Sequence, residues 1–364
     1  MIMDFLLEKF TKDNYPRVNI DKCLSKIYSN KSKCKECIEI CPNDAIDWSR
    51  GKLKFDENLC SKCGLCKSIC PTYAIRIYQF GEENLLSSID SKGKIILSCS
   101  KASEAGNLIF NCLNGIHLEF LIYLFIEYND RTLYFNISKC DTCKSSDHAS
   151  ILLANIDRAV SFIEPLGIQA NYQILKDIND VKKISNSEII SRRDLFKIFG
   201  KESSKLATKA METMVRDDND HLGVRNILVE TLHRNREKFN SQVLETSPFI
   251  NSWEIDNRCD GCEKCKSACP TKAWKFEREN GKLHIYHKSG NCINCGRCKE
   301  VCPKGAISES KVLIEKIKSY SLKRRLDLTT CLSCGKDFIG KDGESDCGLC
   351  NKRQALRAKI ANAK

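Results

Sequence analysis

The sequence has no long apolar run, which excludes a membrane-spanning helix from the predicted fold. Its longest uninterrupted apolar stretch is the seven residues Phe120–Ile126, whereas a membrane span needs roughly 20 residues. The segment Met1–Phe10 contains two acidic residues and an apolar stretch too short for a secretory leader. We therefore expect a cytoplasmic protein with no membrane span.

Catalytic signatures are also missing. No G-x-G-x-x-G run is present, so the dinucleotide-binding fingerprint is absent. No arrangement of a nucleophile with a base stands out. His117 and His148 belong to no metal-binding pattern, and we expect them at surface or helix-capping positions. The sequence thus indicates no catalytic residue.

Cysteine, in contrast, is abundant. The 364 residues include 24 cysteines, most of them in C-x2-C spacing. In a small secreted protein such a number would suggest disulfides. In a long, lysine-rich chain, cysteines that recur at fixed spacing indicate thiolate ligands of metal ions or clusters.

Sixteen cysteines form four copies of one motif that ends in Cys-Pro. Three copies have the spacing C-x2-C-x2-C-x3-C-P, and the first copy has the ten residues 24–33 where the others have two. In every copy an Ala lies three residues after the Pro. The copies form two pairs, within residues 15–80 and 250–310.

This motif resembles that of the bacterial two-cluster ferredoxins, which bind [4Fe–4S] clusters. In that family the fourth cysteine of each run ligates the other cluster of its pair. Zinc knuckles are the alternative, but zinc typically uses two cysteine pairs per site. The resemblance implies four [4Fe–4S] clusters, held by Cys23, Cys34, Cys37 and Cys70; by Cys60, Cys63, Cys66 and Cys41; by Cys259, Cys262, Cys265 and Cys302; and by Cys292, Cys295, Cys298 and Cys269.

The long spacer after Cys23 departs from the family pattern and makes this cysteine the least typical ligand. The entropy of loop closure rises slowly with loop length, so we expect the cluster to be retained.

Residues 92–180 alternate between expected strands and expected helices, which predicts a small α/β domain built of parallel βαβ units. The expected strands are 94–98, 132–137 and 172–175, and the expected helices are 116–128 and 148–163. Cys99, Cys140 and Cys143 fall at or just beyond strand ends, and Cys112 precedes the first helix. Open α/β sheets bind ligands at the carboxyl ends of their strands.

This segment is similar to the delta iron–sulfur subunit of methyl-viologen-reducing hydrogenases. The matching residues are Cys99, the turn Cys112–Gly115, and the pair Cys140 and Cys143, although the family usually spaces that pair more widely. The resemblance implies a [2Fe–2S] centre in the middle domain. A zinc site and free buried thiols remain the alternatives.

The segment 188–248 is expected to form a linker of charged, amphipathic helices. Within it, Ser191–Lys197 resembles a twin-arginine export motif, but its internal position favours an ordinary helix start, with Ser191 and Asp194 as a capping box.

The last cysteines predict a metal-binding tail over residues 325–364. Two C-x2-C knuckles separated by twelve residues are typical of a zinc ribbon, and a rubredoxin-like iron site is the alternative. Phe338 is expected to form the small core, and a short basic helix to follow from Asn351. The ligands would be Cys331, Cys334, Cys347 and Cys350.

The net charge of +12 would ordinarily suggest a nucleic-acid partner. A site with four thiolates carries about −2, so four clusters would lower the total to about +4. The basicity is therefore interpreted as counter-charge of the cofactors, and nucleic acid is not an expected partner.

The sequence as a whole predicts an α+β protein with ferredoxin-like modules at 1–82 and 249–315 on either side of the α/β domain. We expect a polyferredoxin-type electron carrier whose partners are donor and acceptor oxidoreductases. The main alternative is an iron–sulfur subunit of a hydrogenase, formate dehydrogenase or disulfide-reductase complex, and a redox-sensing or assembly protein is a third. Whether the chain is itself an enzyme stays open.

Overall fold

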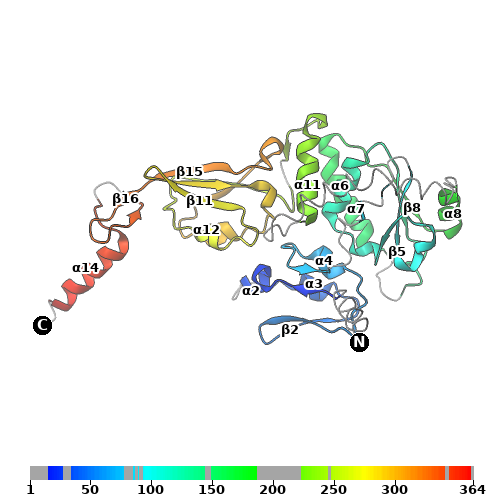
Figure 1. Cartoon of the computed structure of the whole chain (residues 1–364), viewed down its shortest axis with the longest axis horizontal. Helices are drawn as coiled ribbons and strands as arrows, with labels where there is room; N and C mark the ends of the chain where they lie inside the picture. Colours follow the sequence, from blue (N-terminus) through cyan, green and yellow to red (C-terminus); the bar gives the residue numbers. More distant parts are fainter. Residues whose placement is uncertain are drawn as a thin grey trace, which may run out of the picture. The chain divides into compact units, whose positions relative to one another are not determined.

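The computed structural model describes residues 15–27, 34–77, 85–86, 89, 93–143, 149–186, 223–244, 247–340 and 344–361 (Figure 1). The chain divides into two compact units, Met1–Gln242 and Val243–Lys364. Both contain helices and strands, in agreement with the expected α+β class. No helix among the described residues is long and apolar enough to cross a membrane. All 24 cysteines are described, and all are free thiols.

The first cysteine-rich segment folds around two short antiparallel strand pairs, β1–β4 and β2–β3. Its core joins Ile46, Leu53 and Ile75 to the buried thiols Cys66 and Cys70, so the ligand loops and the core form together. The elements are β1 (Arg17–Val18), α2 (Leu24–Ile27), α3 (Glu36–Glu39), β2 (Ile46–Ser49), β3 (Lys52–Phe55), α4 (Leu65–Ile69) and β4 (Ile75–Arg76).

The middle segment forms a parallel sheet with the strand order β6-β5-β7-β8. Figure 1 shows α6 and α7 on one face of this sheet and α8 on the other. Ile96 and Leu175 pack toward Val181 of α8, and because side chains alternate along a strand, Leu97 points to the opposite face. The elements are β5 (Ile95–Cys99), β6 (Leu108–Phe110), α6 (Leu118–Glu127), β7 (Leu133–Asn136), α7 (Ser150–Ile163), β8 (Tyr172–Leu175), α8 (Ile178–Asn186) and α11 (Gly223–Arg234).

All five elements expected in this segment are present, each within two residues of the expected bounds. β6 has only three residues and was not among the expected strands. Its position depends on Asn107, whose side chain accepts a hydrogen bond from the backbone N–H of Ile96 at 2.8 Å. Of the expected linker helices only α11 is described, and Ser191–Lys197 lies outside the described residues.

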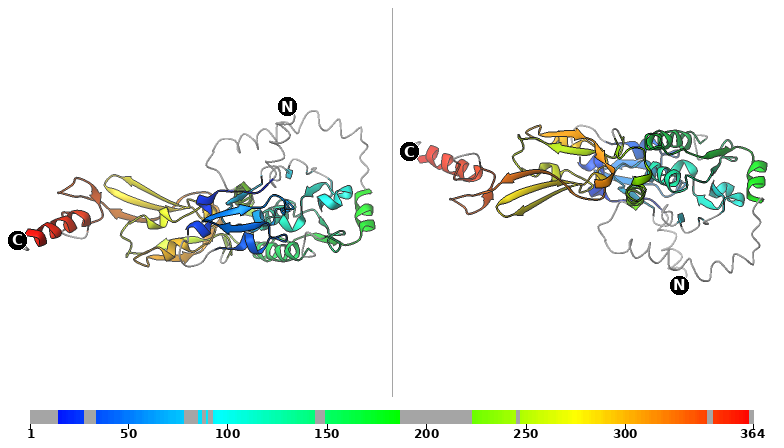
Figure 2. Two further views of the ribbon diagram at one scale, coloured as in Figure 1. Left: turned by 90° about the horizontal axis from the view of Figure 1, so that it is seen from below. Right: turned by 90° about the horizontal axis from the view of Figure 1, so that it is seen from above.

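The second unit contains the other cysteine-rich module, built on longer strands (Figure 2). β10 pairs with β13, β9 pairs with β14, and β12 lies between β11 and β15 in an antiparallel sheet. Its core includes Trp253, Trp274, Leu283 and Ile285. The elements are β9 (Val243–Leu244), β10 (Ser252–Ile255), α12 (Lys264–Ser267), β11 (Trp274–Glu279), β12 (Lys282–His287), α13 (Arg297–Glu300), β13 (Ile307–Ser310), β14 (Val312–Leu313) and β15 (Ser321–Asp327).

The tail comprises a short hairpin, β16 (Thr329–Thr330) with β17 (Asp337–Phe338), followed by the helix α14 (Gly348–Ala361). The helix is longer than the short one expected from Asn351, because it begins inside the second knuckle. Asp346 accepts hydrogen bonds from the backbone of Ser333 and from Gln354 Nε2, which ties the start of α14 to the first knuckle.

Candidate iron–sulfur and metal sites

Two cavities in the first unit gather the cysteines of the first two motif copies. One cavity is lined by Cys23, Cys34, Cys37 and Cys70. The other is lined by Cys41, Cys60, Cys63 and Cys66. Each cavity combines three cysteines of one copy with the Cys-Pro cysteine of the other.

The second unit repeats this exchange. A cavity is lined by Cys259, Cys262, Cys265 and Cys302. The remaining four cysteines of the module also lie near one another. Burial, with smaller contributions from the neighbouring thiols of Cys269 and Cys295, raises the pKa of Cys292 to about 11. Burial likewise raises the pKa of Cys298 to about 12, with contributions from the thiols of the same group.

The Cys-Pro turns share one geometry. The sulfur before each Pro accepts a hydrogen bond from the backbone N–H four residues later, at 3.2–3.3 Å. The residue before that N–H has a positive φ of 50–57° in all four turns. The donors are Ala45, Ala74, Ala273 and Ala306, each only 1–3% exposed, which explains why a small residue recurs there.

The three regular C-x2-C-x2-C loops each contain two left-handed residues, one just before and one just after the middle cysteine. Alternating right- and left-handed residues turn successive backbone N–H groups toward one point, and such nests bind anions, including iron–sulfur clusters. In the first copy the residue just after the middle cysteine Cys34, Lys35, has a negative φ of −121° and departs from this pattern. The left-handed residues are Lys62 and Gly64, Gly261 and Glu263, and Asn294 and Gly296.

Buried thiols need a cationic partner before they ionise. Burial raises the pKa of Cys37 and of Cys265 to about 12 in each case. Iron would supply the missing positive charge, since metal ligation deprotonates the thiol. Sets of four thiols beside inward-turned N–H groups therefore fit [4Fe–4S] clusters.

One tryptophan supplies an additional donor that the cysteine motif does not predict. Trp253 is 2% exposed, and its Nε1–H donates to Cys292 Sγ at 3.4 Å. Tryptophan lies outside the cysteine motif, so no spacing rule could have indicated this contact.

The four middle cysteines lie at one edge of the parallel sheet. Cys99 ends β5, Cys112 caps the short turn Leu113–Gly115, and the other two follow β7. Burial, with smaller contributions from the thiols of the other three, raises the pKa of Cys140 to about 12. Lys101 Nζ donates to Cys143 Sγ at 3.2 Å, so the site also holds a cation suited to a thiolate.

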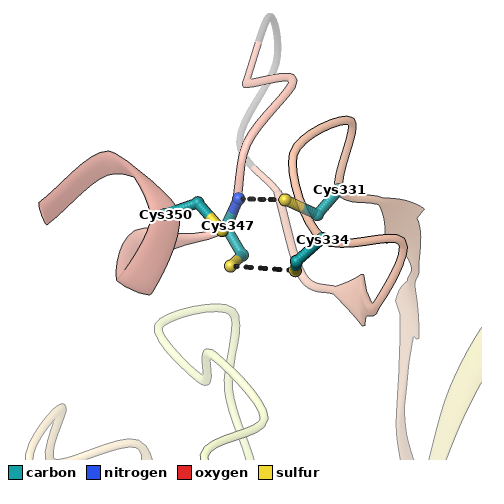
Figure 3. A group of neighbouring side chains, drawn as sticks. All are labelled: Cys331, Cys334, Cys347 and Cys350. Atoms are coloured by element: carbon teal, nitrogen blue, oxygen red, sulfur yellow. Dashed lines mark hydrogen bonds between the residues drawn. The ribbon is translucent and has the colours of Figure 1, made fainter. Parts of the chain in front are cut away.

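The terminal cysteines form the most compact group (Figure 3). The sulfur atoms of Cys331, Cys334, Cys347 and Cys350 all lie within 4.8 Å of one another. Cys334 Sγ and Cys347 Sγ are 3.9 Å apart. A tetrahedral zinc with bonds of about 2.3 Å would place its sulfur ligands about 3.8 Å apart. The group therefore fits a single ion.

His117 occupies the capping position that was one of its two expected environments. Its Nδ1 accepts a hydrogen bond from the backbone N–H of Glu119 at the start of α6.

The fold and the cysteine sites together define an iron–sulfur protein, and comparison with known proteins gives its family. The model of a 4Fe-4S dicluster domain matches residues 258–306, and that of a 4Fe-4S binding domain matches residues 53–76. These segments include three motif copies and leave out the altered first copy, Cys23–Cys41.

Two curated relatives are ferredoxins. "Ferredoxin 7Fe" from Hydrogenibacillus schlegelii is 34% identical over 58 residues, which cover 16% of this chain and 74% of the relative. "Ferredoxin" from Alicyclobacillus acidocaldarius subsp. acidocaldarius is 36% identical over 52 residues, which cover 14% of this chain and 67% of the relative. The chain belongs to the ferredoxin family of iron–sulfur proteins, as the motif resemblance predicted.

Proposed function

We propose that this protein is a polyferredoxin-type carrier that relays low-potential electrons between a donor and an acceptor oxidoreductase. The observation that supports it most is the repeated exchange of Cys-Pro cysteines, which gives each module two sets of four thiols. Clusters at these sets supply one-electron transfer. The protein's own residues bury the thiols, donate N–H groups to them and exclude water.

The two remaining cysteine sets take different cofactors in this proposal. The middle set of Cys99, Cys112, Cys140 and Cys143 holds a [2Fe–2S] centre, because a lysine and the strand ends surround it. The terminal set holds zinc, because its sulfur spacing suits one ion. The abundance of reduced thiols favours a cytoplasmic location.

Anaerobic metal and sulfide analysis of the reconstituted chain tests this proposal. Four [4Fe–4S] clusters require about 16 irons per chain, and the middle centre about two more. One zinc is expected in addition. About eight irons or fewer, or clusters that stay oxidised at ferredoxin potentials, would overturn the relay.

The second candidate is a subunit of a larger oxidoreductase, and the surface of α14 supports it. Leu349, Leu356 and Ile360 are 75%, 59% and 56% exposed, and their spacing places them along one side of the helix. Exposed apolar residues in a row favour a protein contact. Anaerobic purification of the tagged chain decides between the candidates: a co-purifying flavin, molybdenum or nickel subunit supports the complex, and its absence supports the free carrier.

A further inference from the structure

The first ferredoxin module and the middle domain share a tight backbone contact next to their cysteine sites. Gly64 follows Cys63 in one ligand loop, and Gly115 ends the turn that begins at Cys112. A Cβ added at Gly115 would lie 2.4 Å from the backbone oxygen of Cys63 and 3.2–3.3 Å from backbone atoms of Gly64. Only glycine allows this approach.

A hydrogen bond fixes the register of the contact. Asn111 Nδ2 donates to the backbone oxygen of Lys62 at 2.7 Å. The donor and the acceptor each lie next to a cysteine, Cys112 on one side and Cys63 on the other. The two ligand loops are therefore held together at their cysteine ends.

A second, buried contact supports the same arrangement from α6. Tyr73, in the turn after Cys70, stacks on His117 with ring centroids 5.1 Å apart. Glu119, two residues further along the chain, forms a bidentate ion pair with Arg225 of α11 at 2.5 and 2.8 Å. Both side chains of the pair are at most 3% exposed. Rotation of the module against the sheet would break the stack of Tyr73 on His117, and the buried ion pair holds α6, which carries this histidine at its start, against α11.

We propose that Gly64, Gly115 and Asn111 form a junction that makes the middle cysteine site the direct electron-transfer neighbour of the Cys41, Cys60, Cys63 and Cys66 site. A one-electron exchange across it oxidises one centre and reduces the other, and no bond or proton is involved. The middle domain thus extends the relay of the first module by one centre. This inference rests on the proposed iron–sulfur centre at the middle site.

EPR of the full, reconstituted chain reduced with dithionite tests the junction. We expect the signal of the middle centre to be broadened and to relax faster when the neighbouring cluster is reduced. Gly115→Ala must push the loops apart and Asn111→Ala removes their hydrogen bond, so both variants should lose this magnetic interaction while they keep their iron.

Asn171→Ala is the matched control. It removes a similar bond, from Asn171 Nδ2 to the backbone oxygen of Asn129 at 2.9 Å, within the same domain, and the interaction should persist. If the middle centre contains iron but its EPR relaxation rate does not change when the neighbouring cluster is reduced, the junction is overturned and the relay is not. A middle site without iron would also overturn it, and an iron content of about 16 would then still support four clusters.

Discussion

At the residue scale, the indole of Trp253 distinguishes one cluster site from the other in the second module. Its N–H points at Cys292 Sγ, and an N–H donor stabilises the more negative, reduced form of a cluster. Trp253→Phe should therefore lower the potential of that cluster. A difference of about 0.5–1 kcal/mol between the two oxidation states corresponds to roughly 20–40 mV for one electron.

An EPR-monitored redox titration measures this shift. The other clusters in the same chain are the internal control, and they should keep their potentials. An equal shift of all the clusters would show that the substitution disturbs the fold rather than one hydrogen bond.

The terminal thiols should make metal binding depend on pH. The backbone N–H of Cys350 lowers the pKa of Cys347 to about 7, whereas a hydrogen bond with Cys347 raises the pKa of Cys350 to about 12. Protons compete with the metal for these sulfurs, so affinity should fall as the pH falls, about tenfold per pH unit for each proton released. The transfer of zinc to a chromophoric chelator measures the affinity of the site at each pH. A zinc affinity that stays constant between pH 6 and 8 would contradict the assigned ligands.

The four ferredoxin cysteine sets were predicted from the resemblance of the motif to the two-cluster ferredoxins, and this prediction did not include what surrounds the thiols. Three of the left-handed residues beside the middle cysteines are glycines, namely Gly64, Gly261 and Gly296. Because glycine adopts positive φ easily, these three positions carry a signal in the sequence. Lys101 and Trp253 approach their sulfurs only through tertiary packing, and no local pattern encodes that.

At the scale of elements, a buried ion pair between Glu119 and Arg225 joins α6 to α11 in the first unit. Removing one partner leaves the other charge buried and unpaired, at a cost of about 3–5 kcal/mol. Arg225→Met should lower the denaturant midpoint of the first unit strongly. Glu119→Leu combined with Arg225→Met should recover much of the loss, because no unpaired charge remains.

Anaerobic denaturation followed by circular dichroism compares these variants. Arg234→Met is the matched control, since Arg234 pairs with Glu127 between the same two helices but its side chain is 53% exposed. An equal loss of stability in Arg225→Met and Arg234→Met would contradict the role assigned to burial.

The elements that the sequence predicted are those with strong apolar patterns, such as α6 and β7. β6 was missed because three residues carry no periodicity. β15 was missed because its Ser321–Asp327 segment is rich in lysine and arginine, and only pairing with β12 makes it a strand. α11 was expected only as part of a charged linker, since its buried Arg225 does not resemble a core residue.

At the scale of the whole molecule, each of the two units contains a ferredoxin module and one further cysteine site. The first unit adds the parallel sheet with a further cysteine site, and the second adds the terminal metal site. The family and its cluster type were predictable because the cysteine motif is specific. The junction at Gly115 was not, because it depends on contact between segments about 50 residues apart.

A reductive titration of the anaerobic, fully loaded chain tests the relay most directly. Each [4Fe–4S] cluster accepts one electron, and so does a [2Fe–2S] centre, so the chain should take up about four to five electrons at ferredoxin potentials. Uptake of two electrons or fewer by a chain with its full iron content would contradict the account.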